Sequence, residues 1–301
     1  MNTVERPMTS GVGKTTGALL SQAQGVLATA GIEQAALEAA WLMEHVTGWS
    51  PLRLRIEPDH YIAPKQAEVI LGLAARRANR EPLQYLLGTQ EFLGREFHVS
   101  PAVLIPRPES VLLVEEAAMR LRDRSTPIVV DVGTGSGCLA VSLAHALPAA
   151  RILAIDVSRE ALVVARENAA RHRVSHRVEW FEGDLLSPLA GRPASTVVDT
   201  IISNPPYIAE RDWDGLQPEV RCFEPSLALM AGPDGLDVHR RLVNMAPQHL
   251  QPGGLLLLEV GCGQAESVCD LAEESGWFRV DAVRKDQAGI DGVVCLERVA
   301  T

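Results

Sequence analysis

Apolar residues follow a helical spacing in the first part of the chain. Between residues 18 and 86 they recur mostly three or four positions apart, as in helices that bury one face. The expected buried stripes are Leu20, Ala23, Leu27 and Ala30; Leu37, Ala40 and Trp41; and Ile70, Leu73 and Ala74. We therefore predict a small helical domain over residues 18–86. Residues 1–17 are polar and rich in Gly and Thr, and we expect a disordered N-terminal extension there.

From residue 128 onwards, short apolar runs alternate with amphipathic stretches. Strands are predicted at residues 128–133, 151–156, 178–184, 197–204, 255–260, 278–283 and 293–299. Helices are predicted at residues 138–147, 159–171, 236–250 and 264–275, with Ser158 as the N-cap of the second. Strands that alternate with helices predict an α/β fold, with a parallel sheet covered on both faces.

The tract between these two regions, residues 87–108, has a different character. It is rich in Gly and Pro and contains two short β-type pieces, at residues 91–93 and 96–99. We read it as a hairpin linker between the helical domain and a second domain over residues 109–301.

Composition limits the classes of function that this protein can have. The chain has 301 residues and a formal charge of −10, which disfavours a nucleic-acid backbone as the main partner. No apolar run approaches the ~18 residues of a membrane span, and the first twenty residues do not resemble a secretory signal, so we expect a cytoplasmic protein. The five cysteines form no Cys-x-x-Cys pair, and neither a disulfide framework nor a metal site is expected.

A glycine-rich turn follows the first predicted strand of the second domain. Residues 131–137 read Asp-Val-Gly-Thr-Gly-Ser-Gly, and Asp156 stands 19 residues later, at the end of the next strand. Glycines let the backbone approach a ligand closely, and an acid at that strand end can hold the two hydroxyls of a ribose. A dinucleotide site would have a third glycine where Cys138 stands. The pattern favours a nucleoside cofactor such as S-adenosylmethionine, and the alternative is a purely structural turn.

A second motif, Ser203-Asn204-Pro205-Pro206-Tyr207, follows the fourth strand. The prolines fix the backbone and contribute no N–H donors. The Asn204 carboxamide oxygen and the Pro205 carbonyl are therefore two rigid acceptors, suited to the two hydrogens of an NH₂ group. Tyr207 offers a flat face for a planar group. The alternative is an ordinary turn after a strand.

With these motifs, the chain resembles the amino-group methyltransferases, and within them the release factor glutamine methyltransferases. That family methylates the side-chain amide of the Gly-Gly-Gln glutamine in class I peptide chain release factors. The resemblance extends from about residue 20 to residue 299. Matching text stands at residues 80–88, 91–92, 103–109, 133–137, 204–208, 223–225, 228–229, 252–254 and 259–261.

The resemblance implies a Rossmann-like S-adenosylmethionine-dependent methyltransferase sheet, with an N-terminal helical domain that docks the substrate and a β-hairpin linker. The implied partners are class I release factors, with no membrane, no metal and no direct nucleic-acid substrate. The implied cofactor-binding residues are Gly133, Thr134, Gly135, Ser136, Gly137, Asp156, Asp184, Leu185 and Asn204. The implied substrate-binding residues are Asn204, Pro205, Pro206 and Tyr207, with Asn204, Pro205 and Tyr207 as the catalytic ones.

Two alternatives share the Asn-Pro-Pro-Tyr motif. A glutamine methyltransferase of a ribosomal protein is disfavoured only by the N-terminal and linker resemblance. An adenine-N6 DNA methyltransferase is disfavoured by the charge and by the lack of an evident base-reading domain.

The chain also departs from the family pattern in two places. Ser110-Val111 stands where the family often has Thr-Glu, and Gly292 follows Asp291 where an Asp-Arg pair is usual. We expect neither departure to touch the reaction centre.

Overall fold

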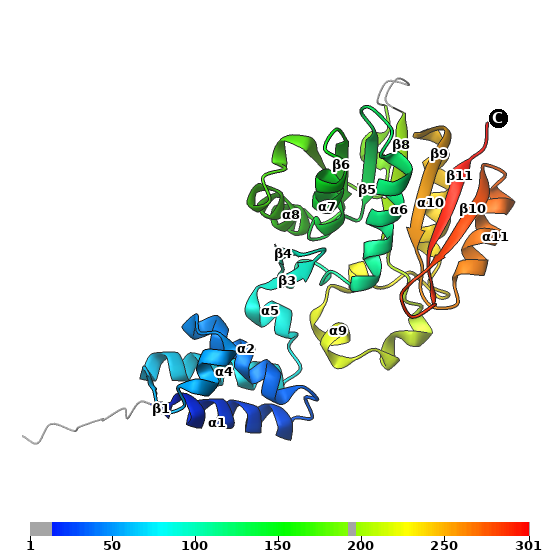
Figure 1. Ribbon diagram of the computed structural model, residues 1–301. Helices are drawn as coiled ribbons and strands as arrows, with labels where there is room; N and C mark the ends of the chain where they lie inside the picture. The colour runs from blue at the N-terminus through cyan, green and yellow to red at the C-terminus, as the bar shows by residue number, and fades with distance from the viewer. Residues whose placement is uncertain (1–13, 192–196, 301) are drawn as a thin grey trace, which may run out of the picture. The chain divides into compact units, whose positions relative to one another are not determined.

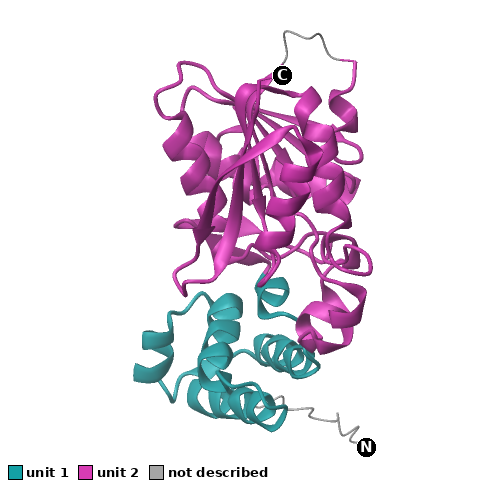
Figure 2. Cartoon of the chain, turned by 90° about the vertical axis from the view of Figure 1, so that its right-hand side faces the viewer, with its two compact units in different colours: residues 1–87 teal, residues 88–301 magenta. Residues whose placement is uncertain are grey.

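The computed structural model describes residues 14–191 and 197–300. The chain divides into two compact units, Met1–Leu87 and Gly88–Thr301 (Figure 2). Within the described ranges, no helix combines the length and the apolar character needed to cross a membrane.

The first unit is helical, as predicted, and its helices enclose a core of their own. Its elements are β1 (Lys14–Thr15), α1 (Thr16–Thr29), α2 (Ala35–Thr47), α3 (Pro51–Ile56), β2 (Tyr61–Ile62), α4 (Pro64–Ala78) and α5 (Leu83–Leu87) (Figure 1). The stripe predicted on α4 is buried in full. On α1, Ala23 and Leu27 are buried as predicted, but Leu19 is buried in place of Leu20, and on α2 Leu37 is 39% exposed. Adjacent apolar residues are about 100° apart on a helix, so packing decides which of them faces the core.

The expected disorder of residues 1–17 is wrong at its C-terminal end. Lys14–Thr15 pairs with Tyr61–Ile62, and the Thr15 side chain caps α1 by accepting a hydrogen bond from the Ala18 N–H. The rest of that prediction, residues 1–13, lies outside the described residues.

The second unit contains a sheet with the strand order β10-β11-β9-β8-β5-β6-β7 in its described residues. The strands are β5 (Ile128–Val132), β6 (Arg151–Asp156), β7 (Val178–Glu182), β8 (Val198–Ser203), β9 (Leu250–Glu259), β10 (Phe278–Lys285) and β11 (Asp291–Arg298). All neighbours are parallel except β11, which runs antiparallel to β9 and to β10. The prediction of a parallel sheet is therefore wrong at this edge. Parallel neighbours need a crossover of a dozen or more residues, and only five separate β10 from β11.

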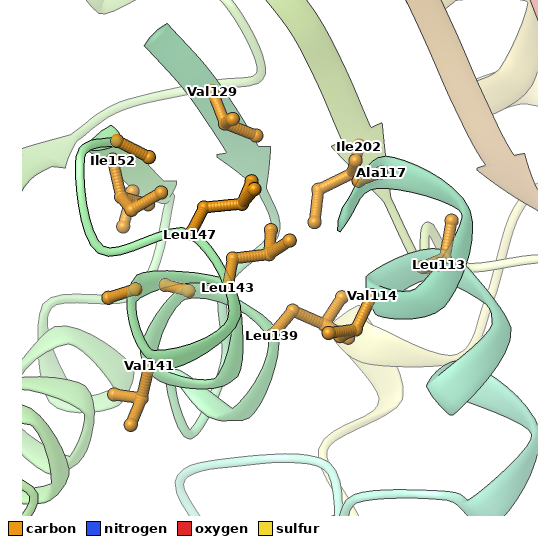
Figure 3. Close-up of a cluster of buried hydrophobic side chains, with 14 of the residues drawn as sticks. Leu113, Val114, Ala117, Val129, Leu139, Val141, Leu143, Leu147, Ile152 and Ile202 are labelled. Carbon is orange, nitrogen blue, oxygen red and sulfur yellow. The ribbon is translucent and has the colours of Figure 1, made fainter. Parts of the chain in front are cut away.

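Helices cover both faces of this sheet, which confirms the predicted α/β layering. Alternate residues of β9 show the two faces: Leu255 and Leu257 belong to one core cluster, and Leu256 and Leu258 to the other. The covering helices are α6 (Val111–Leu121), α7 (Cys138–Ala146), α8 (Arg159–Arg171), α10 (Asp237–Met245) and α11 (Ala265–Ser275), whereas α9 (Pro218–Phe223) lies in the segment after β8 and has no buried residue. On the first face, side chains of α6 and α7 meet those of β5 and β8, as Leu143 and Ile202 illustrate (Figure 3).

The predicted hairpin exists, as β3 (Thr89–Phe92) and β4 (Arg95–His98). Its Phe92 and Phe97 are buried in the same cluster as α6 and α7, so the hairpin packs as part of the second unit. Helix α6 was not predicted. It opens with a continuous apolar run, residues 111–114, which hides the helical period.

Candidate active site

Three strand ends meet at one edge of the sheet. The register pairs Val132 of β5 with Ile155 of β6 on one side and with Ser203 of β8 on the other. The glycine turn and Asn204 directly follow their strands, and Asp156 is the last residue of β6, so the parallel sheet brings them together at the edge where such folds bind their ligands.

A cavity of about 240 Å³ opens at this edge. Its lining includes Ala102, Val103, Leu104, Gly133, Gly135, Asp156, Val157, Asp184, Leu185, Asn204, Pro206, Pro225, Leu227, Ala228, Met230 and Arg241. Most of the lining is apolar, with a few convergent polar groups, which is the usual character of a cofactor site.

The glycine turn needs its glycines for two different reasons. Gly133, Gly135 and Gly137 have φ values of 72°, 54° and 78°, in the left-handed region that side chains disfavour. At Gly137 a Cβ would also come within 3.0 Å of the Ala165 Cβ, so this glycine lets α7 and α8 pack closely. At Gly133 a Cβ would meet no atom within 4 Å, which leaves the backbone open to the cavity.

Asp131 stabilises the glycine turn through hydrogen bonds from the residues that follow it. It is fully buried; its Oδ2 accepts hydrogen bonds from the Thr134 hydroxyl at 2.6 Å and the Ala140 N–H at 3.2 Å. Its Oδ1 has no partner among the described residues. Desolvation by burial raises the pKa of Asp131 to about 7, although both hydrogen bonds oppose the rise.

This raised pKa predicts a pH-dependent stability. The contribution of Asp131 is fully present below its unfolded pKa of 3.8 and is lost as the pH rises through about 7. Between pH 5 and pH 8 we expect it to remove ~2 kcal/mol from the free energy of unfolding. Asp131→Asn cannot ionise, so the difference between wild type and variant should change by that amount. Urea unfolding at several pH values measures it, with Glu182→Gln, an exposed strand-end carboxylate, as the control. Parallel pH profiles for wild type and Asp131→Asn would contradict the assignment.

Asp156 faces the cavity with both carboxylate oxygens partly occupied. Oδ2 accepts the Gly135 N–H at 2.8 Å, and Oδ1 accepts the Ser158 N–H at 2.9 Å. A third backbone donor, the Val157 N–H, also acts on this carboxylate, and because a carboxylate has about four acceptor positions, acceptor capacity remains for a ribose hydroxyl. Desolvation raises the pKa of Asp156, and the backbone donors oppose that rise.

Asp184 and Leu185 line the same cavity from the turn after β7. The Asp184 carboxylate accepts a hydrogen bond from the guanidinium of Arg241, another lining residue. Leu185 has a φ of +49°, an uncommon conformation for a leucine and one that tends to occur at ligand sites.

The Asn-Pro-Pro-Tyr loop is held from several sides. The Asn204 Nδ2 donates to the Ser110 hydroxyl at 3.0 Å, and the Gln264 side chain donates to the Tyr207 carbonyl at 3.0 Å. Ile208 exchanges backbone hydrogen bonds with the segment at residues 229–231. Burial, together with the nearby Glu259 charge, raises the pKa of Tyr207 to about 12, so its phenol stays neutral at ordinary pH.

Part of the cavity wall is fixed by an ion pair between Arg107 and Glu224. The Glu224 side chain, 1% exposed, accepts hydrogen bonds from the Arg107 guanidinium at 2.5 Å and from the Ile105 N–H at 3.0 Å. This pair joins two segments, residues 102–104 and 225–230, that both supply lining residues.

The predicted site residues divide into two groups. Gly133, Gly135, Asp156, Asp184, Leu185, Asn204 and Pro206 line the cavity. Thr134, Ser136, Gly137, Pro205 and Tyr207 are not part of its lining. The polar groups of Thr134 and Ser136 instead hold the turn together: the Thr134 hydroxyl bonds Asp131, and the Ser136 carbonyl accepts from the buried Asn168 side chain.

Sequence reasoning missed Ser110. The expectation that residues 110–111 lie away from the reaction centre is wrong, because the Ser110 hydroxyl contacts the Asn204 carboxamide. Sequence reasoning also assigned no role to Glu259, which is 3% exposed at the end of β9. An acid that directly follows the apolar run at residues 255–258, at the ligand edge, is a signal that could have identified it.

Comparison with known proteins gives one consistent result. Residues 18–88 match the family model "PrmC N-terminal domain", and residues 109–216 match "Methyltransferase small domain". A release factor glutamine methyltransferase of Geobacter sulfurreducens is 45% identical over 92% of this chain and 94% of its own length. One from Moorella thermoacetica is 43% identical over 90% and 94%. A methyltransferase crystal structure from Pyrococcus furiosus shares the fold, with a TM-score of 0.52, 17% identity, and 69% of this chain and 91% of its own covered. The likeness to the curated relatives extends over both units, and the chain therefore belongs to the release factor glutamine methyltransferase family.

Proposed function

We propose that this protein transfers a methyl group from S-adenosylmethionine to the side-chain amide nitrogen (N5) of the glutamine in the Gly-Gly-Gln motif of class I peptide chain release factors. One observation carries the proposal beyond family membership. The NH₂ side of the Asn204 carboxamide is engaged by Ser110, which leaves its oxygen as an acceptor in the cavity wall. This acceptor lies at the same sheet edge as the glycine turn and Asp156.

The cavity residues fit the proposed cofactor. Gly133 and Gly135 carry no side chains that would fill the space beside the turn, and Asp156 retains acceptor capacity for a ribose hydroxyl. Asp184 and Leu185 would flank the adenine. When bound, S-adenosylmethionine supplies a methyl carbon that is already activated by its sulfonium.

The protein's own task is to make an amide nitrogen nucleophilic. The lone pair of an amide is delocalised into its carbonyl. An Asn204 oxygen and a Pro205 carbonyl that grip both amide hydrogens would turn the lone pair toward the methyl group. They would also stabilise the positive charge that develops on nitrogen, an electrostatic effect of preorganised dipoles. Alignment of the reacting groups adds further acceleration.

Release factors fit this site better than the two alternatives. Residues 18–88 match the family model "PrmC N-terminal domain". The curated relatives are named release factor glutamine methyltransferases, and the similarity covers 94% of the length of each of the two described above. The formal charge of −10 disfavours DNA as a substrate.

The test is a methyl-transfer assay with labelled S-adenosylmethionine. Purified protein is incubated in parallel with a class I release factor, with ribosomal protein and with DNA, and mass spectrometry locates the methyl group. We expect label on the Gly-Gly-Gln glutamine and none on a factor whose glutamine is replaced by alanine. Label on ribosomal protein or DNA, with none on the factor, would overturn the proposal.

Substrate size should matter strongly. A folded factor can make remote contacts, and such contacts contribute to turnover as well as to binding. We expect a short Gly-Gly-Gln peptide to show a kcat/KM at least ~100-fold below that of the folded factor, with kcat itself reduced. Steady-state kinetics on both substrates measure this, and equal values would argue against docking of a macromolecule.

A further inference from the structure

Behind Asn204, two buried side chains from distant parts of the sequence form a chain of hydrogen bonds. The Asn204 Nδ2 donates to the Ser110 Oγ at 3.0 Å. The Ser110 hydroxyl also acts on the Glu259 carboxyl, where its hydrogen bond lowers the pKa, so the three side chains lie within reach of one another. Ser110 is 2% exposed and Glu259 is 3% exposed, and neither lines the cavity.

Resting on the function proposed above, we propose that Ser110 and Glu259 are positioning residues that hold the Asn204 carboxamide with its NH₂ group turned away from the cavity and its oxygen turned toward the substrate amide. The two ends of a carboxamide have nearly the same shape, but one accepts hydrogen bonds and the other donates them. A carboxamide rotated by half a turn would present donors to the donors of the substrate. Productive binding therefore needs a device that sets the orientation.

Ser110 can set the orientation of the Asn204 carboxamide only if the Ser110 hydroxyl proton is donated to a group other than Asn204. A hydroxyl donates one hydrogen bond and accepts two, so a lone serine could face either end of the carboxamide. The Glu259 carboxylate accepts the hydroxyl proton, which leaves the serine oxygen with only lone pairs to offer to Asn204. The Asn204 NH₂ group is the end that satisfies them.

A buried carboxylate at position 259 lowers the stability of the fold, and its presence despite this cost supports a functional role. Its Oε2 has no hydrogen-bond partner in the part of the chain that the structure describes. Burial raises the pKa of Glu259 to about 7; the bond from Ser110 and the charge of Arg107 oppose the rise, and Glu109 adds to it. The preceding residues of β9, Leu255 to Leu258, are buried and apolar, so Glu259 places a buried acid at the end of a hydrophobic run.

The serine is tested with a pair of variants. Ser110→Ala removes the acceptor for Asn204, and Ser110→Thr restores it. We expect Ser110→Ala to lower kcat on the release factor at least ~10-fold, with little change in S-adenosylmethionine affinity, and Ser110→Thr to recover most of the loss. Ser142→Ala is the matched control. Its hydroxyl, on α7, is also buried but has no partner among the described residues.

The carboxylate is tested with Glu259→Leu and Glu259→Gln. We expect Glu259→Leu to unfold at the same or a higher temperature than wild type, yet to turn over at least ~10-fold more slowly. Glu259→Gln keeps one acceptor oxygen, so its kcat should lie between that of wild type and that of Glu259→Leu. A purely structural role would lower stability and activity together. Full activity of Ser110→Ala, or of Glu259→Leu, would overturn the proposal.

A measurement without catalysis separates this proposal from the proposed function. In nuclear magnetic resonance spectra, the Asn204 side-chain NH₂ signals are assigned by their loss in Asn204→Ala. One of these protons should exchange slowly with solvent in wild type and in Ser110→Thr, and rapidly in Ser110→Ala. Equal exchange in all three would overturn the positioning role, even if no release factor were methylated.

Discussion

Replacing Asn204 with alanine should lower the rate of methyl transfer to a release factor by about 10²–10³-fold, the usual cost of losing one preorganised polar contact in a transition state. The variant loses the acceptor for one hydrogen of the substrate amide. The lone pair then stays conjugated, and the positive charge on nitrogen is less well stabilised. Single-turnover methyl transfer, at saturating cofactor and factor, measures the chemical step directly.

Two controls make this result specific. S-adenosylmethionine affinity should change far less than the rate, because Asp156 and the glycine turn remain intact. Asn244→Ala removes an exposed carboxamide on α10, outside the cavity lining, and should leave the rate within about twofold of wild type. A rate for Asn204→Ala within threefold of wild type would show that Asn204 does not hold the substrate.

Replacing Asp156 with alanine should weaken S-adenosylmethionine binding by roughly ten- to a hundredfold. The variant loses the charge-assisted hydrogen bonds proposed to the ribose hydroxyls, which together are expected to contribute about 1.5–3 kcal/mol. It also loses the bonds that the carboxylate accepts from Gly135 and Ser158, so the glycine turn is held less firmly. Isothermal titration calorimetry with S-adenosylmethionine measures the effect.

The matched control for Asp156 lies on the adjacent strand. Glu182 ends β7 and pairs with Asp156 in the register, but it is exposed and is not part of the cavity lining. Glu182→Ala should bind the cofactor as wild type does. Unchanged affinity in Asp156→Ala would remove the ribose role from Asp156.

Much of the secondary structure can be predicted from local pattern alone. The strand at Arg151–Asp156 and the helix at Arg159–Arg171 have the predicted bounds, and the Ser158 side chain caps that helix by accepting from the Ala161 N–H. These features depend on residues only a few positions apart. The position of the glycine turn and of Asn204 after strand ends follows in the same way, because each motif comes directly after an apolar run.

The direction of the last strand is a different matter. Local pattern predicts a strand at residues 293–299, which the structure has at Asp291–Arg298, but its antiparallel place between β9 and β10 depends on the connection and on the neighbour available. Helix α6 shows the same limit, since its apolar first turn becomes recognisable as helix only where it packs against α7 and the sheet.

For the site, the sequence by itself determined which functional groups are present, and the tertiary structure decided how the Asn204 carboxamide is oriented. The motifs contain an amide oxygen, an acid at a strand end and a glycine turn, all of which can be read along the chain. The contact between Asn204 and Ser110 joins residues 94 positions apart, and Glu259 arrives from a third segment. Such a contact depends on how the strand ends and the segment before α6 pack together. No local spacing encodes that packing, so only the folded chain shows which end of the Asn204 carboxamide is left for a substrate.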